Sequence, residues 1–178
     1  KSNFLFQPPI SAPLANVKEG YGLFLGRLSP EKGVETLIQA FQNISFPLKI
    51  AGTGPSNYVN ALKDEASAYH HIEFLGFVSG EEKHQLLMGA SFLIVPSVWF
   101  ENFPVTILEA YAHSKPVIAS AIGGLPFIIK NNVTGFLFDP GSSEHLSSAV
   151  QSMIHNKTYE QLGQNARQYF LENFTEQQ

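Results

Sequence analysis

The sequence Gly22–Gly33, GLFLGRLSPEKG, decides the fold of this chain. It opens with a short apolar run, which is typical of a parallel strand that is buried on both faces. A turn containing Arg27 and Lys32 follows. The next segment, Gly33–Gln42, spaces its apolar residues three and four positions apart, as on one face of a helix. The stretch therefore predicts a strand, a loop and a helix in succession.

The same alternation continues to the end of the chain. Short apolar runs predict strands at Gly22–Gly26, Leu48–Ala51, Ile72–Leu75, Phe92–Pro96, Pro116–Ala119 and Gly135–Phe138. Segments between and after them predict helices at Gly33–Gln42, Asn57–Ala68, Ser79–Met88, Pro104–Ala112, Glu144–Ile154 and Tyr159–Phe174. Ser79 stands where helices favour a capping residue, and Pro104 where their first turn accepts proline. We therefore expect an α/β fold, a Rossmann-like doubly wound parallel sheet of about six strands, with ligands bound beyond the carboxyl ends of the strands.

The composition is that of a globular domain. With 178 residues, 44% of them hydrophobic and 15% charged, the chain suits one domain with a sizeable core. The formal net charge is −4 and no long basic stretch occurs, which argues against a nucleic-acid partner. Cysteine is absent, which excludes disulfides and thiol catalysis, and no apolar run reaches the length of a membrane span. A cytoplasmic protein is expected.

The opening residues, 1–18, are rich in proline, serine, alanine and asparagine, and they predict a linker. The domain itself is then predicted at residues 19–178, with no internal repeat and no low-complexity tract. Because the sequence starts at Lys1 rather than at a methionine, we expect a fragment of a longer protein.

The loop after the first predicted strand carries two cations, Arg27 and Lys32, just before a helix begins. The arginine fork and the mobile lysine charge both suit phosphate oxygens, and a helix N-terminus adds amides and a positive dipole end. The alternative is that two surface cations merely flank a turn. Taken alone, these residues favour neither interpretation.

The loop after the fourth predicted strand carries Glu101, and Glu109 lies on the second turn of the following helix. A carboxylate accepts two hydroxyl hydrogen bonds at once, which suits sugars and ribose. The two glutamates could therefore hold sugar hydroxyls on either side of a diphosphate docked on the amides of Val105 and Thr106. A solvated loop glutamate and an ordinary helix glutamate are the simpler alternative.

Two further loops are expected at the same edge of the sheet. The pair Gly123-Gly124 would let the backbone approach a ligand closely, although a plain turn explains it equally well. Gly76-Phe77-Val78 could meet a flat base with backbone groups. A metal site is not expected, because Asp64 and Asp139 are the only aspartates and the six histidines are scattered.

Seven sequence blocks follow one another in a fixed order along nearly the whole chain. They are Gly26–Gly33, Ala51–Pro55, Leu75–Val78, Pro96-Ser97 with Glu101–Glu109, Lys115–Ala119, Gly123-Gly124 and Thr134–Leu137. In this order they resemble the C-terminal domain of the retaining glycosyltransferases of family four, which have the two-domain GT-B fold. The resemblance implies that the chain is the donor-binding half of such a fold.

The resemblance also implies a role for each candidate residue. Arg27 and Lys32 match the pair that neutralises the donor diphosphate, and Glu109 matches the glutamate that binds the ribose hydroxyls. Glu101 matches the first glutamate of a two-glutamate motif, beside the transferred sugar, so that Arg27, Lys32 and Glu101 are the implied catalytic residues. Further donor contacts are implied at Asn102, Phe103, Pro104, Val105, Thr106, Gly123 and Gly124, and a lining for the base at Gly76, Phe77 and Val78.

The implied activity is the transfer of a sugar, with retained anomeric configuration, from a nucleotide diphosphate sugar, expected to be UDP-linked. The implied acceptor is a glycan or a lipid-linked glycan in polysaccharide or O-antigen (lipopolysaccharide) synthesis. Arg27 and Lys32 would replace a divalent metal at the leaving diphosphate, so no cofactor is expected. The other implied partner is an N-terminal domain, and a lipid-linked acceptor would bring the whole enzyme to the inner face of the membrane. The isolated chain is expected to bind nucleotide but to transfer little sugar.

The sequence departs from the family pattern at two positions. Phe127 stands where family members often carry a glutamate, and Pro104 removes one backbone amide as a ligand. Two other functions stay open: a nucleotide-sugar epimerase of the same fold, and a non-catalytic nucleotide-binding domain. The arginine–lysine block and the spacing of the two glutamates favour the glycosyltransferase.

Overall fold

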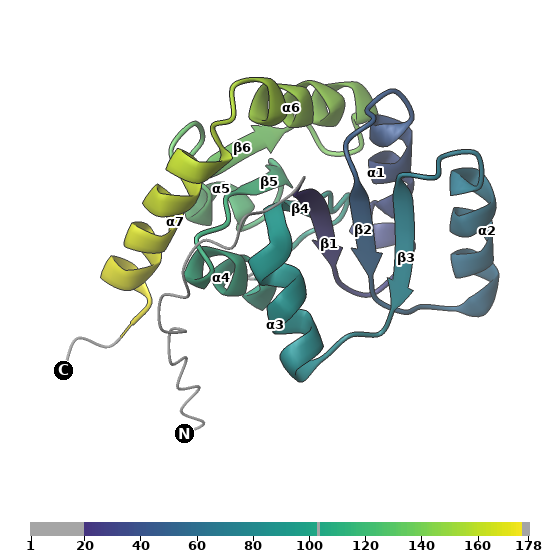
Figure 1. The fold of residues 1–178 in the computed structure, drawn as a ribbon, viewed down its shortest axis with the longest axis horizontal. Helices are drawn as coiled ribbons and strands as arrows, with labels where there is room; N and C mark the ends of the chain where they lie inside the picture. The colour runs from purple at the N-terminus through teal and green to yellow at the C-terminus, as the bar shows by residue number, and fades with distance from the viewer. Residues whose placement is uncertain (1–19, 103, 176–178) are drawn as a thin grey trace.

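The computed structural model describes residues 20–102 and 104–175, which form one six-stranded sheet with helices on both faces (Figure 1). The strands are β1 (Tyr21–Leu25), β2 (Leu48–Ala51), β3 (Ile72–Gly76), β4 (Ala90–Val95), β5 (Val117–Ser120) and β6 (Gly135–Phe138). They pair in parallel in the order β3-β2-β1-β4-β5-β6. This order confirms the predicted doubly wound α/β fold. The predicted linker, residues 1–18, lies outside the described residues.

Helices cover the sheet in two layers (Figure 1). They are α1 (Val34–Phe41), α2 (Ser56–Ala66), α3 (Gly80–Gly89), α4 (Val105–Ala112), α5 (Leu125–Ile128), α6 (Ser143–His155) and α7 (Tyr159–Asn173). One core cluster joins the sheet to α1, α2 and α6, and a second joins it to α3, α4, α5 and α7. Successive strand residues alternate between the clusters, as Leu23 and Phe24 do in β1. Burial on both faces explains why the central strands β1, β4 and β5 are almost continuously apolar, whereas β2 and β3 contain Lys49 and Glu73.

The structure differs from the sequence-based expectations at the ends of several helices and strands. β4 begins before the predicted Phe92–Pro96, and the short α5 and a 3-10 turn at Pro30–Lys32 were not predicted, because elements of three or four residues show no periodicity. Ser79 does precede α3, but its side chain makes no capping hydrogen bond. Pro104 is the residue before α4 rather than part of its first turn.

The strand order creates a crevice between β1 and β4. These neighbours lie at the centre of the sheet, and the chain leaves β1 toward α1 on one face but leaves β4 toward α4 on the other. The two loops therefore diverge at the carboxyl edge of the sheet, where open α/β folds bind their ligands.

Gly33 fixes the distance between these two loops. It has a left-handed backbone, with φ at 68°, and ends the turn that leads into α1. A Cβ atom at this position would overlap the carbonyl oxygen of Pro96, which follows β4. The amide of Val98 also donates to the carbonyl oxygen of Glu31, at 3.0 Å. The loops after β1 and β4 are thus in direct backbone contact.

Gly33→Ala is expected to lower the free energy of unfolding by about 2–4 kcal/mol, because it adds left-handed strain to a collision with a fixed carbonyl. Gly80→Ala is the matched control: its φ is also positive, at 52°, but a Cβ atom there meets open space. The free energy of unfolding of the control should fall only by the cost of the backbone strain, about 1–2 kcal/mol. Urea unfolding of both variants tests this, and equal losses would contradict the packing argument.

Candidate functional site

The loops after β1 and β4 bring two predicted site residues together. The Lys32 ammonium forms an ion pair with Oε1 of Glu101, although the two residues are 69 positions apart. The hydroxyl of Ser97, which is fully buried, donates to the same carboxylate oxygen at 2.8 Å. Both partners of the ion pair are largely shielded from solvent, so the carboxylate is held in a defined position at the mouth of the crevice.

Arg27 lies on the open side of the first loop. Its guanidinium donates to Oε1 of Glu31 at 2.9 Å, and its side chain is 69% exposed. The hydroxyl of Ser29 donates to the same oxygen, and this hydrogen bond, with smaller contributions from the backbone amide of Glu31 and the charge of Arg27, lowers the pKa of the Glu31 carboxyl. Exposed ion pairs of this kind contribute little free energy. Arg27 can therefore exchange its partner for an anionic ligand at small cost.

The first turns of α4 supply a second group of predicted residues. Val105 and Thr106 begin the helix, and the leading amides of a helix have no acceptor within it. One turn later, Oε1 of Glu109 accepts from the ammonium of Lys83 on α3, at 2.5 Å. Of the residues just before α4, Asn102 is exposed, and Phe103 lies outside the described residues.

A cavity of about 530 Å³ opens at the carboxyl ends of β1, β2 and β3. Among the predicted residues, its wall includes Arg27, Phe77, Val78 and Thr106, but neither Glu101 nor the glycine pair. The full lining is Leu25, Gly26, Arg27, Ala51, Gly52, Thr53, Gly54, Phe77, Val78, Lys83 and Thr106. The candidate site thus has two adjoining parts, this cavity and the ion pairs beside it, and Lys83 belongs to both.

The pair Gly123-Gly124 backs the site rather than facing the cavity. A Cβ atom at either position would overlap backbone atoms of Glu101 or Asn102. The amide of Gly124 also donates to the carbonyl oxygen of Glu101, at 2.8 Å. These glycines therefore let the loop after β5 support the loop that carries the glutamate. The side chain of Phe127, three residues after Gly124, is 78% exposed and carries no polar atom.

Two parts of the cavity wall were not predicted as site residues. Gly52-Thr53-Gly54 follows β2, and the carbonyl oxygen of Thr53 accepts from the amide of Leu28 at 2.8 Å. A Cβ atom at Gly54 would overlap the carbonyl oxygen of Leu28. Two glycines directly after a predicted strand were the sequence signal that could have identified this loop as part of the site. The sequence signal for Lys83 was weaker, because a lysine in the first turns of a helix usually faces solvent.

Two histidines form a second link between α3 and α4. Nδ1 of His113 lies 2.7 Å from the carbonyl oxygen of Glu109, so this nitrogen carries the proton and donates. Nε2 of the neutral ring then accepts from Nδ1 of His84, at 2.8 Å. Burial, with smaller contributions from His84 and Lys115, lowers the pKa of His113 below its usual 6.5, against the opposing effect of Glu109.

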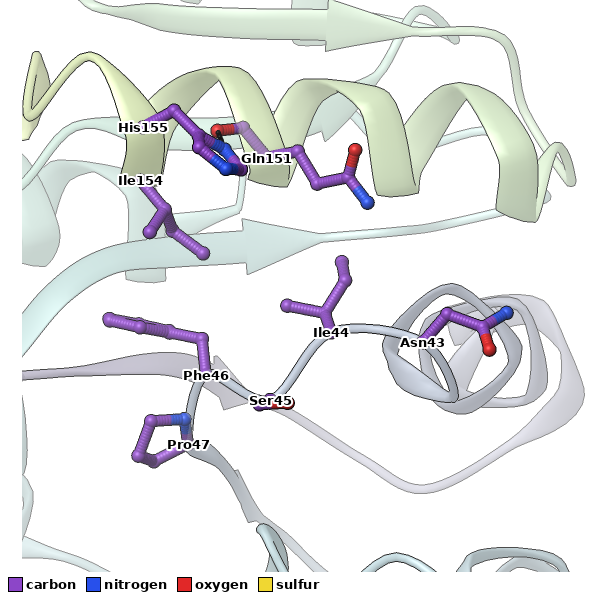
Figure 2. Close-up of a pocket in the computed structure, with 8 residues that line it drawn as sticks. All are labelled: Asn43, Ile44, Ser45, Phe46, Pro47, Gln151, Ile154 and His155. Atoms are coloured by element: carbon purple, nitrogen blue, oxygen red, sulfur yellow. Dashed lines mark hydrogen bonds between the residues drawn. The ribbon is translucent and has the colours of Figure 1, made fainter.

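A second cavity, of about 410 Å³, lies between α6 and the loop that precedes β2 (Figure 2). Its wall combines apolar side chains of both segments with the polar tips of Asn43 and Gln151. Because residues 43–47 lead into a strand, this cavity is at the amino edge of the sheet, opposite the crevice. It is thus separate from every predicted site residue.

Neither a cluster of metal-binding side chains nor a membrane-spanning helix occurs within the described ranges, 20–102 and 104–175. No group of three or more histidine, aspartate or glutamate side chains gathers there in a way that could hold a metal ion. No helix within the same ranges combines the length and the apolar composition needed to cross a bilayer.

The chain belongs to the glycosyl transferases group 1 family, whose sequence profile matches residues 9–169. Among curated relatives, an uncharacterized glycosyltransferase of Methanocaldococcus jannaschii is 36% identical over 155 residues, which are 84% of this chain and 42% of the relative. The O-antigen chain mannosyltransferase C of Escherichia coli is 29% identical over 162 residues, 89% of this chain and 44% of that protein. The chain thus spans less than half the length of these relatives.

A solved structure shares this fold closely. Anabaena HepE in complex with UDP matches with a TM-score of 0.81 and 26% sequence identity, over 88% of this chain and 45% of that one. The likeness confirms the fold class predicted from the sequence, the Rossmann-like C-terminal half of a GT-B glycosyltransferase.

The lowered pKa of His113 predicts a loss of stability in mild acid. Below about pH 6.5 the unfolded chain takes up a proton that the folded chain still excludes, so the free energy of unfolding falls as the pH falls. Urea midpoints measured between pH 7.5 and 5.5 should decline less steeply for His113→Gln than for the wild type. His70→Gln, at an exposed position, is the control and should keep the wild-type slope. Parallel slopes in all three proteins would refute the assignment of this pH dependence to His113.

Proposed function

We propose that this chain is the nucleotide-sugar-binding part of a retaining glycosyltransferase of family four. The observation that carries the proposal is the meeting of two loops at the crevice. One loop brings Arg27 and Lys32, the other brings Glu101, and α4 adds Glu109 and its leading amides. Cations and helix amides suit a diphosphate, and paired carboxylates suit sugar hydroxyls. Of these groups, Arg27 and Thr106 at the start of α4 line a cavity of about 530 Å³.

The donor is proposed to lie along the carboxyl edge of the sheet. Its base would meet Gly76, Phe77 and Val78, of which the last two line the cavity. Its ribose would bind Glu109, and its diphosphate would face Arg27 and the start of α4. The transferred sugar would then lie beside Glu101. UDP is the proposed nucleotide, and the similarity to HepE, which was solved with UDP, supports this choice.

Catalysis in this proposal depends on the leaving diphosphate. Negative charge grows on it as the glycosidic bond breaks, and fixed cations aimed at that charge stabilise the transition state more than the ground state. Arg27 and Lys32 would supply this stabilisation in place of a divalent metal. As Lys32 turns to the phosphate, Glu101 is released from the ion pair and can accept hydroxyls of the transferred sugar. Glu101 thus acts in binding rather than as a nucleophile.

The acceptor belongs to the whole protein rather than to this chain. We propose a glycan or lipid-linked glycan in polysaccharide or O-antigen synthesis, because the relatives include an O-antigen chain mannosyltransferase. An N-terminal domain would supply the acceptor wall, on the cytoplasmic side of the membrane. The 178-residue chain should accordingly bind nucleotide but transfer little sugar to any acceptor.

Arg27→Ala and Lys32→Ala should each weaken the binding of a nucleoside diphosphate by about 1–3 kcal/mol, the contribution of a hydrogen bond to a charged group. Lys32→Ala should lose more, because it also leaves the carboxylate of Glu101 unpaired near the phosphates. Calorimetric titration with UDP, GDP and ADP identifies the base and measures both losses. Lys63→Ala, on the exposed face of α2, is the control. Wild-type affinity in both variants would exclude the diphosphate clamp.

Alanine variants of the two glutamates should differ in which ligand they bind less tightly. Glu109→Ala should weaken a nucleoside diphosphate and its sugar conjugate alike, because both contain the ribose. Glu101→Ala should leave the nucleoside diphosphate nearly unchanged and weaken the sugar conjugate by about 1–2 kcal/mol, within the range of hydrogen bonds to charged groups. Titration of each variant with UDP and with UDP-glucose gives the comparison. An equal loss on both ligands for Glu101→Ala would reject its assignment to the sugar.

A further inference from the structure

Lys83 is a cation of the site to which the proposed function gives no role. It lies in the first turns of α3, lines the cavity of about 530 Å³, and pairs with Glu109 across the gap between α3 and α4. The Lys83 side chain is 33% exposed, while that of Glu109 is only 13% exposed. Lys83 thus lines the cavity, and its ammonium holds a carboxylate that is mostly hidden from water.

The start of α3 depends on polar contacts for its position. Leu87 is the only buried residue of the helix, and glycines with positive φ, Gly76 and Gly80, flank the segment that leads into it. Two side-chain links then tie α3 to α4, from Lys83 to Glu109 and from His84 to the ring of His113. The second link does not involve the Glu109 carboxylate, so the two links can be separated by mutation.

The pairing uses one oxygen of the Glu109 carboxylate. Oε1 accepts from the ammonium at 2.5 Å, and Oε2 has no hydrogen bond to another described residue. A glutamate side chain rotates freely unless it is held, and ordering it costs conformational entropy. An ion pair on Oε1 fixes the plane of the carboxylate and keeps Oε2 ready for a ligand hydroxyl.

We propose that Lys83 is a positioning residue, which orients the Glu109 carboxylate to bind the hydroxyls of the donor ribose. The inference rests on the proposed function, in which Glu109 is the ribose ligand. Lys83 acts through Glu109 and makes no direct contact with the phosphates, which Arg27 and Lys32 hold. Its contribution to affinity therefore requires that the ligand carry ribose hydroxyls.

The test compares ligands with and without these hydroxyls. UDP, GDP and ADP and their 2′,3′-dideoxy counterparts are titrated into the wild type, Lys83→Met and Lys83→Arg by calorimetry. Lys83→Met should weaken the nucleotide that the wild type binds best by about tenfold, the effect of one hydrogen bond to a charged group. It should weaken the dideoxy form less than about twofold, and Lys83→Arg should restore most of the loss.

His84→Gln is the matched control. It removes the other link between the same two helices, so a purely structural contribution of α3 would weaken binding in this variant as well. We expect His84→Gln to keep the wild-type ratio of affinities for the ribose and dideoxy forms. Thermal unfolding of all variants verifies that each one folds.

The outcomes separate the two proposals. If Lys83→Met weakens both forms of the nucleotide equally, the lysine contacts phosphate or only supports the fold, and the positioning role is overturned. Unchanged affinity for both forms also overturns it, while the diphosphate site itself stands. If the wild type binds none of the three nucleotides, the proposed function fails, and the role of Lys83 fails with it.

Discussion

The contact between the loops after β1 and β4 is the constraint on which the rest of the site depends. Gly33 allows it, because no other residue leaves room for the carbonyl of Pro96, and the hydrogen bond from Val98 to Glu31 closes it. Only at this separation can the ammonium of Lys32 reach the carboxylate of Glu101. The chemistry of the crevice is thus a product of backbone packing at the centre of the sheet.

Charge balance is the second property of the site. Each of its three cations is paired with a carboxylate, Arg27 with Glu31, Lys32 with Glu101, and Lys83 with Glu109. The pairs differ in exposure, and the exposed one is the cheapest to break. A diphosphate that enters would replace carboxylates as the partner of the first two cations. The binding free energy is then the difference between two sets of ion pairs, which favours ligands that also bind the released carboxylates.

Much of this fold could be predicted because the central strands β1, β4 and β5 are buried on both faces and therefore read as nearly unbroken apolar runs. The ends of the elements and the short α5 could not be predicted, because a segment of four residues such as Leu125–Ile128 is too short to show a helical period of apolar residues. The cations and carboxylates of the site could be proposed from their residue types and spacing. The pairing of Lys83 with Glu109 could not be predicted, because it depends on how two helices pack. Gly123-Gly124 was compatible with a ligand contact or a plain turn, and the packing of one loop on another that its missing side chains allow became visible only in the structure.

The pairing of β1 with β4 also governs when the site can form. All of α1, β2, α2, β3 and α3 lie between these two strands in the sequence, so their contact closes a very long loop of chain. Contacts of high sequence separation form late and slow the folding of parallel sheets. During synthesis, β1 and β2 can pair while β4 is still unmade, and the crevice has no second wall until then. The capacity to bind a ligand therefore cannot arise before the chain has been made through β4 and α4.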